Sequence, residues 1–175
     1  MKKTNNNLNQ KYSKTTIVTH WLSALLILVL TIQGFYMKDL VYADKTGLVK
    51  LHAIMGAFLL LINIPRFFSL FIARRPDHLE TGSPFNDKLI IWIHNGLYFL
   101  IFSIIISGIS TTLLGGYAKV IQTGLVDNII PSEKLLPLQI HSIMSILITV
   151  LVFIHVVGFF KHWLIQKENT LKRIL

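Results

Sequence analysis

Four long apolar segments constrain the fold of this chain more than any other feature of its sequence. They cover residues 17–37, 51–72, 89–114 and 138–163. Each meets the length of about 20 residues that a helix needs to cross a bilayer. Because lipid offers the backbone no hydrogen-bond partner, segments that span it must be helical. The sequence therefore predicts an all-α integral membrane protein, a bundle of four transmembrane helices.

The rest of the chain is short. Of 175 residues, 53% are hydrophobic, above the ~45–50% typical of soluble domains. We expect a basic tail at 1–16, one transmembrane domain at 17–164 and a second basic tail at 165–175. No small-residue cleavage site follows the first apolar run, so we interpret it as a retained helix rather than a signal peptide. The stretch "AKVIQTGLVDNII" between the last two spans predicts a short interfacial helix.

Basic residues are distributed unevenly between the two ends of this bundle. The end with both tails carries Lys2, Lys3, Lys11, Lys14, Arg66, Arg74, Arg75, Lys88, Lys161, Lys167, Lys172 and Arg173, and the other end carries Lys38, Lys45, Lys50, Lys119 and Lys134. Since Lys and Arg favour the cytoplasmic side, both termini of this multi-pass protein are expected there. The net charge of +9 therefore indicates membrane-side loops rather than nucleic-acid binding, for which no aromatic and basic patch is present.

The chain has no cysteine. This excludes disulfides, thiolate metal sites, Cys-ligated iron–sulfur clusters and covalent haem attachment through CxxCH. Any metal or cofactor must be held by other residue types.

Histidines inside apolar segments are the main candidates, because ionisable residues in a membrane are costly and are functional hypotheses by default. His141 and His155 are 14 residues apart, so they share one helix face within about 40° and lie ~21 Å apart along the axis. Under the expected topology His52 lies at the depth of His141, near the outer surface. His20 lies at the depth of His155, near the inner surface.

These depths define two pairs, His52 with His141 and His20 with His155. Two imidazoles facing each other across a helical bundle make a bis-histidine site, and haem fits it best because its iron takes an imidazole on each side. Zinc would prefer a larger ligand set, and a proton relay would prefer carboxylates within the spans. Taken singly, such a histidine is more often an interhelical hydrogen-bonding residue than a ligand.

Three further residues are candidates around the inner site. His94 could bond a haem propionate, line a quinone pocket or simply pack. His162 lies on the face of His155 within ~20°, so it either faces the inner haem edge or is a solvated end-of-helix residue. Arg66 lies 14 residues after His52, and it either clamps a propionate or extends to the lipid headgroups.

The sequence resembles the bacterial cytochrome b561 family, which is related to the membrane cytochrome b subunits of nickel–iron hydrogenases. The resemblance rests on "YSKTTIVTHWL" (12–22), "LHAIMGAFLLLINIPR" (51–66), "HNGLYFLIF" (94–102), "SG" (107–108), "QIHSIMSILITVLVFIHVVGFFKHW" (139–163) and "KENTLKRIL" (167–175). It implies two b-type haems, with His20 and His155 as ligands of the inner haem and His52 and His141 as ligands of the outer one. It also implies electron transfer involving ubiquinone or another quinone, with superoxide as a donor in some members.

We therefore expect a dihaem cytochrome b that moves electrons across the membrane between a donor and the quinone pool, with superoxide:ubiquinone oxidoreductase as one specific form. No acid–base or nucleophilic catalytic residue is required, since a cofactor carries such chemistry. Two alternatives remain open. One is an electron-transfer anchor subunit of a larger dehydrogenase or hydrogenase, with an unknown protein partner, and the other is a haem-free polytopic protein such as a small transporter.

Overall fold

The computed structural model describes residues 6–72, 76–126 and 129–175. Four long helices dominate it: α1 (Lys14–Lys38), α2 (Tyr42–Ile72), α3 (Pro84–Leu114) and α5 (Leu136–Gln166). The short helix α4 (Tyr117–Thr123) and two 3-10 turns, η1 (Ser132–Lys134) and η2 (Thr170–Arg173), lie in the connections and near the C-terminus. Four basic residues of the topology prediction, Lys2, Lys3, Arg74 and Arg75, lie outside the described residues.

Local sequence signals explain where several helices begin. Ser13 caps α1, because its side chain accepts a hydrogen bond from the Thr16 amide. Proline occupies the first turn of α3 and of α5, where its missing N–H costs nothing. Gly116 and Gly124 flank α4 with positive φ angles of 81° and 74°, a conformation that glycine adopts without strain.

The four long helices are long and apolar enough to cross a membrane, with candidate spans Lys14–Lys38, Asp44–Ser69, Pro84–Leu114 and Leu136–Ile165. This agrees with the predicted four-span, all-α class. The helices extend beyond the apolar runs: α2 begins at Tyr42, ahead of the expected start at residue 51. The reason is that a helix continues through the polar interface, whereas hydropathy marks only the segment suited to the hydrocarbon core.

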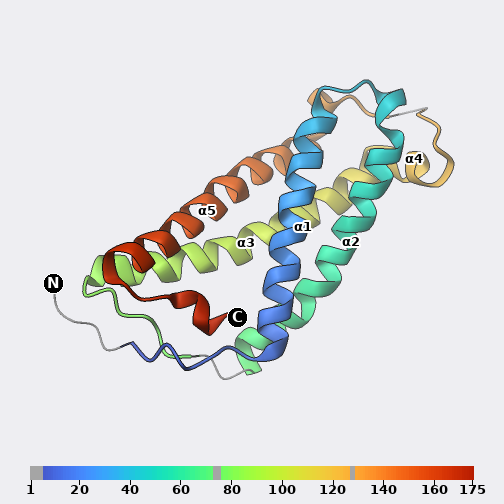
Figure 1. Ribbon diagram of the computed structural model, residues 1–175. Helices are drawn as coiled ribbons and strands as arrows, with labels where there is room; N and C mark the ends of the chain where they lie inside the picture. Colours follow the sequence, from blue (N-terminus) through green and yellow to red (C-terminus); the bar gives the residue numbers. More distant parts are fainter. Residues whose placement is uncertain (1–5, 73–75, 127–128) are drawn as a thin grey trace.

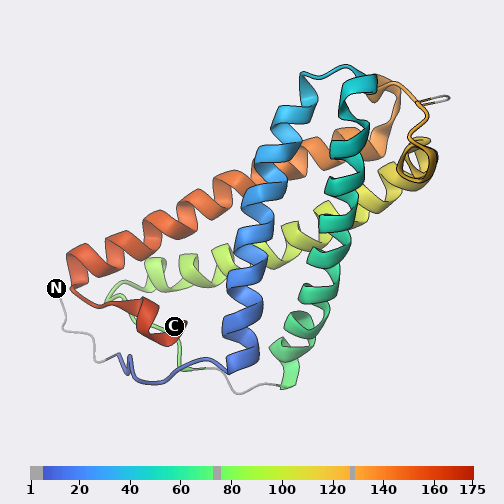
Figure 2. The same cartoon turned by 45° about the vertical axis from the view of Figure 1, so that its right-hand side comes forward.

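The helices form two pairs that cross each other. Figure 1 shows α1 beside α2 and α3 beside α5, and the view in Figure 2 preserves both pairings. Both described chain ends and the 76–83 connection lie at one end of the bundle, called here the terminal end. Helix α4 lies at the opposite end, called here the α4 end.

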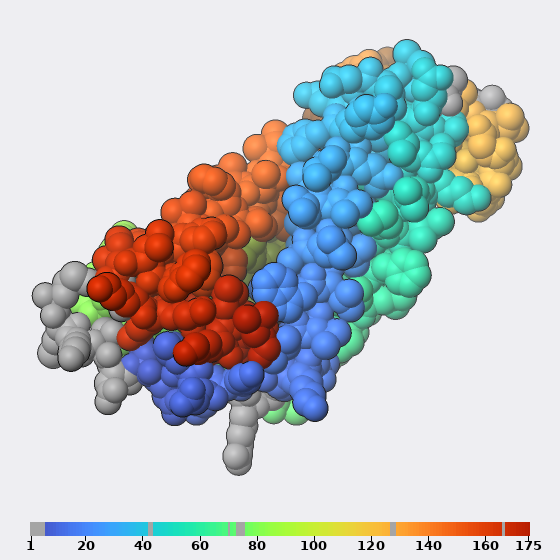
Figure 3. Space-filling view, in the orientation of Figure 1, coloured from blue at the N-terminus to red at the C-terminus, as the bar shows by residue number. Residues whose placement is uncertain are grey.

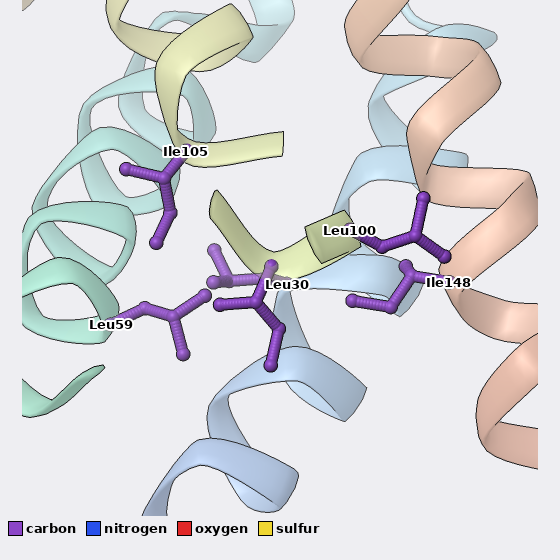
Figure 4. Packing of buried hydrophobic residues seen from close by; sticks show 6 residues of the cluster. Leu30, Leu59, Leu100, Ile105 and Ile148 are labelled. Atoms are coloured by element: carbon purple, nitrogen blue, oxygen red, sulfur yellow. The ribbon is translucent and has the colours of Figure 1, made fainter. Parts of the chain in front are cut away.

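A small cluster of aliphatic side chains joins the four helices at the centre. It contains Leu30 of α1, Leu59 of α2, Leu100, Ile101 and Ile105 of α3, and Ile148 of α5 (Figure 4). Most other large apolar side chains are exposed at the outer surface, for example Leu25, Ile32 and Phe153. An apolar exterior of this kind is suited to lipid and leaves the interior for the polar groups of the site.

Candidate functional site

Six histidines lie on the four long helices. Helices α1, α2 and α3 carry His20, His52 and His94, and α5 carries His141, His155 and His162. The structure brings five of them into two groups, one nearer each end of the bundle. The two groups are about 21 Å apart along α5, from the 14 residues between His141 and His155.

The group nearer the α4 end is a pair. The ring centres of His52 and His141 are 6.0 Å apart, and the ring planes form an angle of 73°. The His141 Nδ1 lies 2.9 Å from the backbone oxygen of Ile104 and 3.1 Å from Ser107 Oγ. Because a carbonyl only accepts, Nδ1 carries the proton, and Nε2 is left with a lone pair. This is the arrangement by which metal-binding histidines are commonly oriented.

The second ring of this pair is that of His52, and two glycines, Gly34 and Gly108, lie close to the two rings. His52 Nδ1 is buried and has no hydrogen-bond partner among the described residues. A Cβ added at Gly108 would lie 3.1 Å from His141 Cε1, and one added at Gly34 would lie 3.7 Å from His52 Cε1. Gly108 in particular gives the His141 ring the space that it occupies.

The group nearer the terminal end has three imidazoles. The ring centres of His20 and His155 are 6.4 Å apart, with an angle of 60° between the planes. His94 lies edge-on to His155 at 5.0 Å. His94 Nδ1 lies 2.7 Å from the Ile90 carbonyl oxygen, so this nitrogen is the donor and His94 Nε2 keeps its lone pair. Sequence reasoning placed His94 in this region, but its contact with His155 came only from the packing of α3 against α5.

Arg66 of α2 reaches the same group. Its Nη2 donates to His20 Nδ1 at 3.1 Å, and its guanidinium carbon lies 5.3 Å from the centre of the Tyr98 ring. Its Nε and Nη1 are buried without a hydrogen-bond partner among the described residues. The side chain therefore points into the bundle rather than to headgroups, and it holds two unused donors beside the histidines. Tyr98, which sequence reasoning missed, lies one helical turn after His94 on α3.

His162 occupies a different environment from the other five histidines. Its side chain is only 7% exposed, and its Nδ1 lies 3.7 Å from Glu168 Oε2. Neither ring nitrogen has a hydrogen-bond partner within the described structure. Of the two alternatives for this residue, burial contradicts the solvated helix end, because the chain turns back after α5 and covers the side chain, and a place at the inner haem edge stays a prediction.

The spacing of the two pairs determines what they can hold. A metal–imidazole bond is about 2 Å long and a ring nitrogen lies about 1 Å from the ring centre, so one metal between two rings holds their centres about 6 Å apart. The observed 6.0 and 6.4 Å match this distance. In the part of the chain that the structure describes, no three His, Cys, Asp or Glu residues form a group that could hold a metal ion. The pairs therefore fit a haem iron, whose porphyrin supplies the remaining ligands, better than zinc.

Comparison with known proteins agrees with this chemistry. The family model "Prokaryotic cytochrome b561" matches residues 11–175. Cytochrome b561 homolog 2 of Escherichia coli (strain K12) is 29% identical over 178 residues, which cover 97% of this chain and 93% of that protein. No solved structure gives a significant match. The family match spans nearly the whole chain, and we conclude that the chain belongs to the prokaryotic cytochrome b561 family of membrane electron-transfer proteins that bind b-type haem.

Proposed function

We propose that this protein is a dihaem cytochrome b that transfers electrons across the bacterial inner membrane between a donor and the quinone pool. The observation that carries the proposal is the presence of two histidine pairs, at 6.0 and 6.4 Å, at two depths of one bundle. His52 and His141 would hold one haem, and His20 and His155 the other. Each haem iron, when bound, supplies a reversible one-electron change.

The chain's own residues prepare these ligands. Ile104 O and Ser107 Oγ fix the His141 ring and leave its Nε2 free to bind a metal. The inner pair differs, because Arg66 occupies His20 Nδ1 as a donor and the neutral ring then carries its proton on Nε2. Binding of an iron by His20 Nε2 therefore requires that this proton leave the nitrogen.

Arg66 is suited to bind a haem propionate. Two of its buried donors are unused, and a carboxylate would satisfy both in the two-pronged geometry that arginine favours. If the guanidinium moved to a carboxylate, it would also release His20 Nδ1. His94, with a free Nε2 lone pair, would bond a propionate of the inner haem or line a quinone pocket, and the buried His162 would face the inner haem edge.

We place the terminal end in the cytoplasm, because the excess of basic residues lies there. The pair His52 and His141 would then be the outer site, reached first by a donor from outside the membrane. An open surface cavity of about 310 Å³ lies at the terminal end, and another of about 300 Å³, lined by polar and apolar residues alike, lies at the α4 end. The latter lies between α2 and α4, and Lys50, two residues before His52, lines it.

The positive charge at this cavity supports a small anionic donor such as superoxide. Lys50 is an exposed cation on another face of α2 but only about 3 Å from His52 along the helix axis, and a positive charge on this end of the bundle raises the association rate of an anion. Lys50→Gln should slow superoxide-driven haem reduction, and added salt should slow the wild type but affect the variant less. Lys134→Gln, an exposed lysine that does not line the cavity, is the control. Equal rates in all three proteins would exclude Lys50 from donor entry.

The central test is the haem count and its dependence on each pair. Pyridine haemochrome analysis of the purified protein should give about two haems per chain. His52→Ala and His141→Ala should remove the same component of the redox titration, and His20→Ala and His155→Ala the other. His78→Ala is the control, because His78 lies exposed in the 76–83 connection. Loss of different components by His52→Ala and His141→Ala would disprove the pairing.

A further inference from the structure

The two ends of the chain meet at the terminal end. The N-terminal residues 6–13, the connection 76–83 and the C-terminal residues 168–175 contact one another, and we call this assembly the terminal clasp. Figure 3 shows the C-terminal segment in red lying against the N-terminal segment in blue. Basic tails of this kind would be expected to be solvated, so ordered contacts among them need a cause.

The cause lies at Arg173. Its side chain is only 4% exposed, although arginine is rarely buried unless its donors are satisfied. Its Nε donates to the backbone oxygen of Gln10 at 3.2 Å, and its Nη2 donates to that of Asp77 at 2.7 Å. Its own backbone oxygen accepts from the Tyr12 amide at 3.0 Å. One residue thus joins all three segments of the clasp.

Other hydrogen bonds reinforce the same assembly. The Asp77 amide donates to Gln10 Oε1 at 2.9 Å, and Lys11 Nζ donates to the Leu175 backbone oxygen at 3.0 Å. Asn6 Nδ2 donates to Glu168 Oε2 at 2.7 Å and to the Glu80 backbone oxygen at 2.9 Å. Several of these partners are backbone groups, so the clasp depends on the path of the chain and not only on side chains.

The clasp touches the inner histidine group through Trp21, and it also reaches the separate, buried His162. The Trp21 indole N–H donates to the Ile174 backbone oxygen at 2.9 Å, and the Trp21 ring packs edge-on against His20 with the centres 5.4 Å apart. Glu168 lies 3.7 Å from the buried His162. The C-terminal segment that Arg173 holds in place therefore contacts Trp21, the residue next to His20, through Ile174.

We propose that the C-terminal segment 168–175 positions the inner haem site: Arg173 fixes this segment, and Ile174 then holds Trp21 against His20. In this view Arg173 and Trp21 are positioning residues, since neither needs to touch a haem. The orientation of a ligand imidazole is one of the features by which a protein adjusts a bound metal. The positioning role rests on the proposed function, whereas the clasp itself does not.

Three variants, two of them with matched controls, distinguish loss of the clasp from a general loss of folding. Arg173→Gln removes the charged fork that joins the segments, and its control is Lys172→Gln, a neighbouring exposed cation. Trp21→Phe keeps an aromatic ring beside His20 but removes the N–H that binds Ile174, and its control is Trp92→Phe, an exposed indole. Arg173→Lys keeps the positive charge but loses the branched guanidinium donors. Its amide exchange and its inner haem component should lie between those of the wild type and Arg173→Gln.

The first measurement is hydrogen–deuterium exchange, which does not require haem. In Arg173→Gln the Tyr12 amide, which donates to the Arg173 backbone oxygen, should exchange roughly tenfold faster or more, because the C-terminal segment loses the hydrogen bonds of a buried charged side chain. Lys172→Gln should exchange like the wild type. Unchanged exchange in Arg173→Gln would overturn the clasp.

The second measurement is the redox titration and the low-spin electron paramagnetic resonance signal of the two haems. Arg173→Gln and Trp21→Phe should both shift the inner component, assigned with His20→Ala, and leave the outer one in place. An unmoved inner component, or an equal shift of both components, would overturn the positioning role. A wild type without haem would overturn the proposed function and the positioning role together, and the exchange result would still decide whether the clasp exists.

Discussion

At the scale of single residues, Arg66 is the clearest case of a polar side chain turned into a membrane bundle. It contacts His20 and Tyr98 and keeps two buried donors without partners among the described residues. A buried guanidinium with unsatisfied donors is costly unless a partner is supplied. A haem carboxylate is the partner that the proposed function provides.

Replacing Arg66 should therefore change one haem and not the other. Arg66→Leu should lower the inner haem's potential by several tens of millivolts, because a unit charge ~10 Å away at an effective dielectric constant of ~20 contributes about 1–2 kcal/mol, and 59 mV corresponds to a tenfold change for one electron. In Arg66→Lys the inner haem's potential should lie between those of Arg66→Leu and the wild type, since lysine keeps the charge but loses the two-pronged guanidinium geometry. Redox titration measures this, with the exposed Lys88→Leu as the control. Identical inner potentials in wild type and Arg66→Leu would argue against the clamp.

Gly108 offers a second residue-scale prediction, directed at the outer site. In Gly108→Ala the new Cβ would lie 3.1 Å from His141 Cε1 and 3.3 Å from Nδ1, so the ring must shift. We expect a changed potential of the outer component and an unchanged inner one. Gly56→Ala is the matched control, because a Cβ there meets nothing within 4 Å and both substitutions raise helix propensity equally. The same outcome for both alanine variants would mean that Gly108 has no special role.

At the scale of helices, packing is concentrated in few positions. Ile148 of α5 is 1% exposed, at the centre of the cluster that joins the four long helices (Figure 4). Ile146, two residues earlier, is 52% exposed on the outer surface. The same residue type thus occupies an interior and an exterior position on one helix.

Ile148→Ala should lower the free energy of unfolding by about 2–4 kcal/mol, since it removes buried methyl groups and leaves a cavity. Ile146→Ala should change it by less than about 0.5 kcal/mol, because in a membrane that side chain would face lipid in both states. Denaturation in mixed detergent micelles measures both. A comparable loss in the two variants would indicate that α5 is rotated relative to the structure.

At the scale of the whole molecule, both described termini lie at one end, as an even number of spans requires (Figure 1). The proposed orientation puts this end in the cytoplasm. The chain has no cysteine, so single cysteines report topology without a background. In spheroplasts, a membrane-impermeant maleimide should label Glu133→Cys directly and Asn9→Cys only after permeabilisation. The reverse pattern would invert the orientation and exchange the inner and outer sites.

How much of the site could be predicted depends on the kind of information each feature needs. The partners of His141 and His155 followed from depth alone, because topology and a constant rise per residue locate each histidine across the membrane. The hydrogen bonds of His141 to Ile104 and Ser107 could not be predicted, since they depend on how α3 is rotated against α5. A lipid-exposed helix is apolar on its outer face as well as its inner one, so periodicity does not identify the face that packs.

The four spans, the all-helical class, the family resemblance and the two depths at which histidines lie could all be predicted from the sequence alone. These follow from local quantities, namely the length of apolar runs, the count of basic residues and the spacing along a helix. Three contacts became visible only in the folded molecule: His94 lies against His155, Arg66 donates to His20, and Arg173 is buried between the chain ends. Each of these joins segments distant in sequence, and the free energy of such contacts comes from packing and desolvation, which no local pattern encodes.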